Sequence, residues 1–143
     1  MDWTIRDARP EDAADVARLL DQLGYPTTPA AVEGRLERLQ IVGDRVVVAD
    51  LAGRAVGLAH LQVTPAIELD RPAGKIGALV VDEALRGQGI GRALIEAMEE
   101  EARGRGCELV FLTTAERRDD AHAFYERLGL VHTGRRYGRT LSE

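Results

Sequence analysis

Hydrophobic side chains recur along the chain at two spacings, one typical of strands and one typical of helices. Residues 3–6 alternate apolar and polar side chains, which predicts a short strand. After Pro10, which is tolerated in a first helical turn, apolar residues recur at steps of three and four up to Leu23 and predict a helix. A Gly-Tyr-Pro break follows, and Thr28 before Pro29 predicts the N-cap of a second helix. The chain therefore begins with a strand and two helices.

The middle of the chain is dominated by apolar runs without helical spacing. Two of them, residues 46–49 and 55–63, are joined by a turn and predict a hairpin of antiparallel strands. Residues 76–81 form a third run, which is apolar throughout, as expected of a central strand that is buried on both faces. These runs predict the main part of a sheet whose two faces must both be covered.

Helical and strand patterns alternate in the remainder of the chain. In chain order we expect a long helix over residues 90–102, a strand at 109–112, a helix that begins at Asp119 or Asp120 and ends before Gly129, and two closing strands at 130–133 and 137–141. A long helix between two buried strands predicts that those strands pair in parallel. The sequence thus predicts an α/β fold in one domain, residues 1–143, with a mixed, mostly antiparallel sheet flanked by about four helices.

Composition narrows the kind of protein. The formal net charge is −5, which argues against a nucleic-acid surface, and no apolar run approaches the roughly 20 residues that span a bilayer. The single cysteine, Cys107, has no partner for an intrachain disulfide, and with three histidines it does not make a zinc site of the usual spacing. Its place at the start of a strand indicates a small buried side chain rather than a nucleophile. We therefore expect a cytoplasmic protein that binds neither nucleic acid, membrane nor metal.

A glycine-rich turn, residues 86–92, lies between the buried strand and the long helix. Glycine allows the backbone to approach a ligand closely, and the first N–H groups of a helix have no partner within it and carry part of its positive dipole end. Such a turn binds phosphate or pyrophosphate groups. A P-loop would need Gly-Lys-Ser/Thr, which is absent, and a dinucleotide fingerprint is disfavoured because Arg92 occupies the position of its last glycine. A plain strand-to-helix connection is the remaining alternative.

Two segments resemble one enzyme family. Residues 86–91, Arg-Gly-Gln-Gly-Ile-Gly, resemble the Arg/Gln-x-x-Gly-x-Gly/Ala acetyl-CoA signature of the GNAT N-acetyltransferases, and residues 121–130 are similar to the family's Ala-x-x-Phe-Tyr-Glu-x-x-Gly-Phe segment. The resemblance implies a GNAT-like fold and an acetyltransferase that moves the acetyl group of acetyl-CoA to an amine by direct attack in a ternary complex. By the same resemblance, the backbone that holds the CoA pyrophosphate is that of Arg86, Gly87, Gln88, Gly89, Ile90, Gly91 and Arg92, and the backbone that pairs with the pantetheine arm is that of Leu79, Val80 and Val81.

Tyr125 matches the position of the general acid in this family. Acetyl transfer expels the CoA thiolate, whose conjugate acid resembles a cysteine thiol, and a phenol can return a proton to it at modest cost. The alternative is a core tyrosine, because Phe124, Tyr125 and Leu128 share an apolar stripe of the predicted helix.

The resemblance does not identify the general base. An amine similar to lysine costs roughly 4.6 kcal/mol to deprotonate at pH 7, so the reaction needs a proton acceptor. Many relatives carry a glutamate in the strand before the glycine-rich turn, but Gly77 stands at that position here. The candidates are Glu68 first, and then Asp70, Glu33 and His60. The alternative function is a noncatalytic acyl-CoA-binding module.

The first 70 residues hold all of the excess negative charge. They carry 7 basic and 12 acidic side chains, whereas residues 71–143 carry 12 of each. Because this first region builds the acceptor pocket in the family, the resemblance and the charge together predict a cationic acceptor, either a small molecule or a lysine or N-terminal amine. Solvated helix faces are the alternative reason for the charge. The closing strand at 137–141 is expected to leave an unpaired edge, which a second subunit would cover in a homodimer; a monomer is the alternative.

Overall fold

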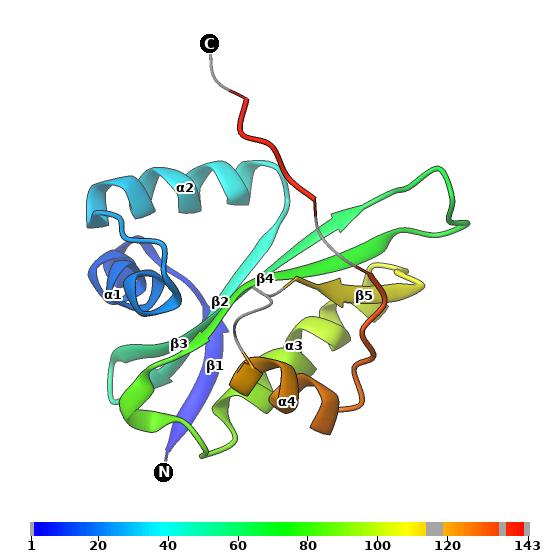
Figure 1. Ribbon diagram of the computed structural model, residues 1–143. Helices are drawn as coiled ribbons and strands as arrows, with labels where there is room; N and C mark the ends of the chain where they lie inside the picture. The colour runs from blue at the N-terminus through cyan, green and yellow to red at the C-terminus, as the bar shows by residue number, and fades with distance from the viewer. Residues whose placement is uncertain (1, 114–118, 135–136, 142–143) are drawn as a thin grey trace. The chain divides into compact units, whose positions relative to one another are not determined.

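The computed structural model describes residues 2–113, 119–134 and 137–141, in two compact units, residues 1–112 and 113–143. The first unit contains the sheet with three α-helices, and the described residues of the second contain one α-helix (Figure 1). The elements of the first unit are β1 (Trp3–Asp7), a 3-10 turn η1 (Pro10–Asp12), α1 (Ala13–Leu23), α2 (Pro29–Ile41), β2 (Arg45–Leu51), β3 (Arg54–Thr64), β4 (Ala73–Val81), a 3-10 turn η2 (Glu83–Leu85), α3 (Ile90–Gly104) and β5 (Leu109–Leu112). The helix of the second unit is α4 (Asp119–Arg127).

One five-stranded sheet forms the centre of the first unit, with the strand order β1-β2-β3-β4-β5. The strands β1 to β4 pair antiparallel with their neighbours. Among the strands that the structure describes, only β4 and β5 pair in parallel, from Ala73↔Leu109 to Ile76↔Leu112. The helix α3 connects these two strands, as the crossover of a parallel pair requires. The predicted mixed, mostly antiparallel sheet is confirmed.

The helices of the first unit cover both faces of this sheet (Figure 1). The side chains that pack toward α1 and α2 include Val48, Leu58 and Val80, and those that pack toward α3 include Leu61 and Ile76. Each face therefore has its own apolar core. The run at residues 76–81 contributes to both cores, which explains why it is apolar throughout.

The two closing strands predicted at residues 130–133 and 137–141 are wrong. In the part of the second unit that the structure describes, the chain after α4 is neither helix nor strand. The apolar side chains Val131, Tyr137 and Leu141 are 79%, 88% and 91% exposed, so no burial of apolar surface favours a strand there. The terminal strand edge on which the expectation of a homodimer rested is therefore absent from the described residues.

A bulge interrupts the pairing of β4 with β3. The register shifts between His60↔Gly77 and Leu58↔Val80, so that two residues of β4 stand opposite one residue of β3. Ala78, within the bulge, has a left-handed φ of +50°, which is uncommon for a residue with a side chain. The additional residue reverses the alternation of side chains along β4. Ile76 faces α3 and Val80 faces α1 and α2, although residues four positions apart in a regular strand face the same side.

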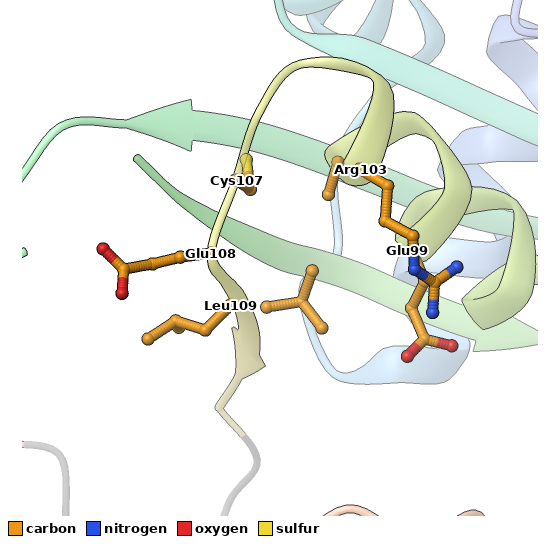
Figure 2. A pocket seen from close by; sticks show the side chains of 7 residues that line it. Glu99, Arg103, Cys107, Glu108 and Leu109 are labelled. Carbon is orange, nitrogen blue, oxygen red and sulfur yellow. The ribbon is translucent and has the colours of Figure 1, made fainter. Parts of the chain in front are cut away.

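A pocket of about 170 Å³ opens where Cys107 precedes β5 (Figure 2). Glu99 and Arg103 of α3 line it together with Glu108. Cys107 is partly buried there. The glycine-rich turn lies at the opposite end of α3, and 15 residues of helix are about 22 Å long. Cys107 is therefore not part of the glycine-rich turn.

The β2–β3 hairpin closes through a two-residue turn, Ala52-Gly53. Both residues have a positive φ, +53° and +87°, as in the type I′ turn that matches the right-handed twist of two strands. The N–H of Gly53 donates a hydrogen bond to Oδ1 of Asp50 at 2.8 Å. Asn-Gly is the preferred sequence of such a turn, because asparagine and glycine adopt left-handed backbone at a lower cost than alanine.

An ion-pair network ties β1 to the start of α1. The guanidinium of Arg6 donates from Nη1 and Nη2 to the two carboxylate oxygens of Asp12, both at 2.8 Å, and from Nε to Asp50 at 2.7 Å. The hydrogen bonds from Arg6 outweigh the effect of burial and, with the N–H of Arg9, hold the pKa of Asp12 below its ordinary value. Asp12 is only 6% exposed, so its charge depends on this pairing.

Ala52→Asn is expected to raise the free energy of unfolding by about 0.5–1 kcal/mol, because asparagine adopts left-handed backbone at a lower cost than alanine. Urea unfolding monitored by circular dichroism measures the change. Ala52→Val is the control and should lower stability, since a β-branched side chain is strained further there. A lower unfolding midpoint for the asparagine variant would contradict the type I′ turn.

Asp12→Asn is expected to lower the free energy of unfolding by about 1–3 kcal/mol at neutral pH, because it removes one of the two carboxylates that pair with the partly buried Arg6 cation and leaves only Asp50. The pKa of Asp12 is depressed in the folded protein, so the charge stabilises the fold above about pH 4 and loses this effect as the pH falls through the folded-state pKa. The difference between wild type and variant should therefore shrink as the pH is lowered in urea-unfolding measurements. A difference that is independent of pH would argue against the ion pair.

Candidate active site

The glycine-rich turn between β4 and α3 is built around two left-handed glycines. Gly87 and Gly89 have φ angles of +83° and +87°, in a region where a side chain is strained. A Cβ built on either residue would have no atom of the described residues within 4 Å. The backbone of the turn is therefore open to close approach by a group from outside the chain.

The turn leads directly into the first turn of α3, for which Gly89 is the N-cap. The N–H of Ala93 donates to the carbonyl oxygen of Gly89 at 3.1 Å, whereas the N–H groups before it have no acceptor within the helix. These groups carry the positive partial charge of the helix end. The side chains of Arg86, Gln88 and Arg92 are exposed beside them. This arrangement can bind an anionic group such as a pyrophosphate.

The start of α3 is seated on β3 through Gly57. A Cβ at Gly57 would lie 3.1 Å from Cγ2 of Ile90 and 3.1 Å from Cδ1 of Leu94. Ile90 is only 1% exposed, so its side chain belongs to the core while its N–H remains at the open helix end. The absence of a side chain at Gly57 thus lets the helix approach the sheet closely and sets the position of the turn.

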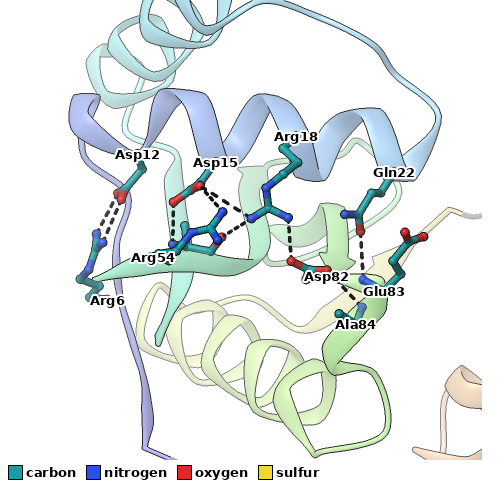
Figure 3. A network of polar contacts seen from close by, with 10 residues as sticks. Arg6, Asp12, Asp15, Arg18, Gln22, Arg54, Asp82, Glu83 and Ala84 are labelled. Carbon is teal, nitrogen blue, oxygen red and sulfur yellow. Dashed lines mark hydrogen bonds and ion pairs between the residues drawn. The ribbon is translucent and has the colours of Figure 1, made fainter. Parts of the chain in front are cut away.

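The first part of the turn is held by α1 (Figure 3). Nη1 of Arg18 donates to Oδ2 of Asp82 at 2.6 Å, and the N–H of Glu83 donates to Oε1 of Gln22 at 3.0 Å. Oδ1 of Asp82 accepts from the N–H of Ala84 at 3.1 Å. Burial opposes the charged form of Asp82, but these hydrogen bonds outweigh it and lower its pKa. Sequence reasoning missed this anchor because Arg18 and Asp82 are 64 positions apart.

Leu79, Val80 and Val81, at the end of β4, have one backbone edge without a strand partner within the described residues, and the carbonyl oxygen of Val81 accepts a hydrogen bond from Nε of Arg86 at 3.3 Å. Val80 and Val81 pair with β3 on one side. On the other side, the pairing of β4 with β5 extends only to Ile76↔Leu112. An unpaired strand edge can bind an extended ligand through backbone hydrogen bonds. Residues 79–81, predicted to contact the pantetheine arm, are therefore followed closely along the chain by residues 86–92, predicted to contact the pyrophosphate.

Gly77 lies opposite His60 in the β3–β4 pairing. Ile76 packs toward α3 and Ala78 packs toward α1 and α2, so the bulge leaves Gly77 and Ala78 on the same side, that of α1 and α2. Nε2 of His60 lies 2.8 Å from Oδ2 of Asp44. The structure thus brings one predicted base candidate, His60, to the position that lacks the glutamate. Sequence reasoning missed its partner Asp44.

The other base candidates lie on the surface. Glu68 and Asp70 are exposed in the connection between β3 and β4, beyond Ala73, where the hairpin pairing begins. From Ala73 to Gly77 the strand extends for about 13 Å. Glu33 is exposed on α2. The structure does not bring Glu68 beside Gly77.

Tyr125 lies in α4 of the second unit. This helix ends before Gly129, whose φ of +84° terminates it in the usual way. Tyr125 is partly buried, and its ring centroid lies 5.7 Å from that of Phe124 with the two planes tilted by 60°. The role of Tyr125 as general acid stays a prediction that rests on the sequence resemblance.

The sequence also predicted that the protein binds neither a metal ion nor a membrane. Within residues 2–113, 119–134 and 137–141, no group of three or more His, Cys, Asp and Glu side chains could hold a metal ion. In the same ranges, no helix has the length and apolar character needed to cross a bilayer.

Known proteins are similar to this chain over most of its length. A family model described as "Acetyltransferase (GNAT) family" matches residues 14–130. Glucosamine 6-phosphate N-acetyltransferase 1 of Oryza sativa subsp. japonica is 34% identical over 134 residues, which cover 86% of this chain and 79% of the relative. Aminoalkylphosphonate N-acetyltransferase of Salmonella typhimurium is 39% identical over 89 residues, 62% of this chain and 58% of the relative. The crystal structure of an acetyltransferase of Trypanosoma brucei is 30% identical and has a TM-score of 0.84, with 98% of this chain and 100% of that chain covered.

The matched range includes the glycine-rich turn, the end of β4 and Tyr125, together with the strands β2 to β5 of the sheet. The similarity therefore extends beyond the glycine-rich turn to most of the sheet and to the helices α1 to α3. The chain belongs to the acetyltransferase (GNAT) family and is an N-acetyltransferase, which transfers an acetyl group to an amine.

Proposed function

We propose that the glycine-rich turn and the end of β4 bind acetyl-CoA, and that the acetyl group passes to a small-molecule amine. The observation that carries the proposal is the pair of left-handed glycines, Gly87 and Gly89, with open space at both Cβ positions in front of α3. A noncatalytic acyl-CoA-binding module is not favoured, because the relatives are named as N-acetyltransferases.

The chemistry of the turn fits the donor. The pyrophosphate of CoA would accept hydrogen bonds from the first N–H groups of α3, where the helix dipole favours negative charge. Arg86 and Arg92 are exposed at the two ends of the turn and add positive charge. The amide groups of the pantetheine arm would pair with the backbone of residues 79–81. The arm would then run from the turn back along β4, which would bring the thioester toward Gly77.

The acceptor is proposed to be a small molecule. Relatives that are 34% and 39% identical are named for glucosamine 6-phosphate and for aminoalkylphosphonate. The acidic side chains expected to attract a cation are exposed and lie on separate elements, namely Asp21 on α1, Glu33 and Glu37 on α2, and Glu68 and Asp70 between β3 and β4. Salt screens exposed charges that are far apart, so these side chains do not decide the charge of the acceptor. The two acceptor classes to be compared are cationic amines and amines that carry a phosphate or phosphonate group.

Gly89→Ala should weaken acetyl-CoA binding by about tenfold or more, because the methyl group strains the turn and occupies the space through which the pyrophosphate approaches. Isothermal titration with acetyl-CoA and with free CoA measures the affinity. Gly106→Ala is the matched control, since Gly106 also has a positive φ, +80°, and an open Cβ position, but follows α3. Both variants should lose about 1–2 kcal/mol of unfolding free energy, and only Gly89→Ala should lose affinity. Equal affinities in the two variants would refute the proposed donor site.

Acetylation rates on a panel of amines test the acceptor. The panel contains amino-sugar phosphates, aminoalkylphosphonates, polyamines, aminoglycosides and lysine-containing peptides, and release of the CoA thiol reports the reaction. We expect kcat/KM for at least one small-molecule class to exceed that for the peptides by about tenfold or more. Highest rates on polyamines and aminoglycosides would support the cationic acceptor, and highest rates on the phosphorus-containing amines would replace it. Highest rates on the peptides would contradict a small-molecule acceptor.

A further inference from the structure

A histidine outside the glycine-rich turn lies opposite Gly77, where the pairing of β4 with β5 has ended. His60 of β3 and Gly77 of β4 are paired across the sheet. In the described part of the chain, a Cβ built on Gly77 would have one neighbour within 4 Å, Nδ1 of His60 at 3.9 Å. One nitrogen of the imidazole therefore faces a space that the side chain of any other residue at position 77 would fill.

The other nitrogen of His60 is held by Asp44. Nε2 lies 2.8 Å from Oδ2 of Asp44, and the side chains of His60 and Asp44 are 22% and 11% exposed. The N–H of Asp44 donates to the carbonyl oxygen of Leu39 at 3.0 Å, which fixes this residue at the end of α2. An ionised carboxylate can only accept a hydrogen bond, so the pairing places the hydrogen of a neutral imidazole on Nε2 and the lone pair on Nδ1. His60 is thus oriented to accept a proton on the side of Gly77.

Gly77 is also where the acetyl group of bound acetyl-CoA is expected. The pantetheine arm would follow residues 79–81 back from the turn, and Gly77 is the first residue of β4 beyond its pairing with β5. The distance along the strand from Val81 to Gly77 is about 13 Å. The bulge at Ala78 turns this part of β4 toward α1 and α2, the side on which His60 lies. An amine that attacked the thioester from this side would meet Nδ1 of His60.

We propose that His60 is the general base of this acetyltransferase and that Asp44 positions it, an inference that rests on the proposed function. Nδ1 of His60 takes one proton from the protonated amine, directly or through a water molecule. The amine nitrogen then attacks the carbonyl carbon of the thioester, the N–C bond forms, the C–S bond breaks, and the bonding electron pair leaves with sulfur. The nitrogen loses a second proton to solvent, and the thiolate gains one, for which Tyr125 is the donor predicted from the sequence resemblance; Tyr125 then regains its proton from solvent. The products are the amide, CoA as the thiol, and one proton that His60 returns to solvent.

His60→Gln tests the base. Glutamine keeps an N–H donor for Asp44 but has no nitrogen lone pair to accept a proton. For a strongly basic acceptor from the panel, kcat should fall by about 100-fold or more, the range of a general-base contribution. For an analogue fluorinated next to the amine, which is largely neutral at the assay pH, kcat should fall by less than about fivefold, because no proton has to be removed before attack. Equal losses on both amines, or no loss on either, would overturn the proposal.

Asp44→Asn tests the positioning of His60. The asparagine amide can donate to Nε2, which moves the imidazole hydrogen to Nδ1 and removes the proton acceptor. We expect the same selective loss of kcat on the basic amine with little change in KM, and partial recovery in Asp44→Glu, which restores the carboxylate. A loss that is equal for both amines would show that Asp44 serves the fold alone.

Binding and stability measurements separate the chemistry from folding. Each variant should bind acetyl-CoA with wild-type affinity and unfold cooperatively in urea. His132→Gln, at an exposed histidine of the second unit, is the matched control and should keep the wild-type rate. If the wild-type protein acetylates no amine, the proposed function fails. If the wild type is active and His60→Gln is equally active, the proposed function stands and only the role of His60 fails.

Discussion

The bulge in β4 is the constraint on which the arrangement of the site depends. This strand pairs with β3 on both sides of the register shift, but with β5 only as far as Ile76 in the described residues. Ala78 adopts left-handed backbone at the shift, a conformation that costs about 1–3 kcal/mol and persists because the pairing on either side holds it. The additional residue turns Gly77 and Ala78 to the same helix layer, while the edge of residues 79–81 is left without a β5 partner. The bulge therefore places Gly77, which His60 faces, next to the strand edge that is proposed to bind the pantetheine arm.

The glycine-rich turn is exposed, yet buried and partly buried contacts determine where it lies. At its far end, Ile90 packs on Gly57 and fixes the start of α3 against the sheet. At its near end, Arg18 holds Asp82 to α1. The left-handed glycines between these anchors have few contacts of their own, so a pyrophosphate would meet a backbone that is already in place. Such preorganisation lowers the entropy lost on binding.

Most elements could be predicted because each has a pattern that extends over several residues. The apolar stripes of α1 and α3 and the uniform run of residues 76–81 are of this kind. The closing strands were wrong because β-branched and aromatic residues such as Val131 and Tyr137 favour a strand only when a neighbouring strand and a core are available, and both side chains are exposed. The bulge had no signal in the sequence, since alanine is not a residue that marks left-handed backbone.

The sequence by itself determined the class of reaction, through its resemblance to the GNAT family, and predicted a turn that can bind an anionic group. Gly87, Gly89 and the helix that follows them form one short segment, and the conformation of a turn and the unpaired N–H groups of a helix start arise from adjacent residues. Only the tertiary structure decided which side chains surround the open end of β4. The approach of His60 to Asp44 and Gly77 depends on the register of β3 against β4 and on where α2 ends, and these long-range pairings leave no local spacing in the sequence.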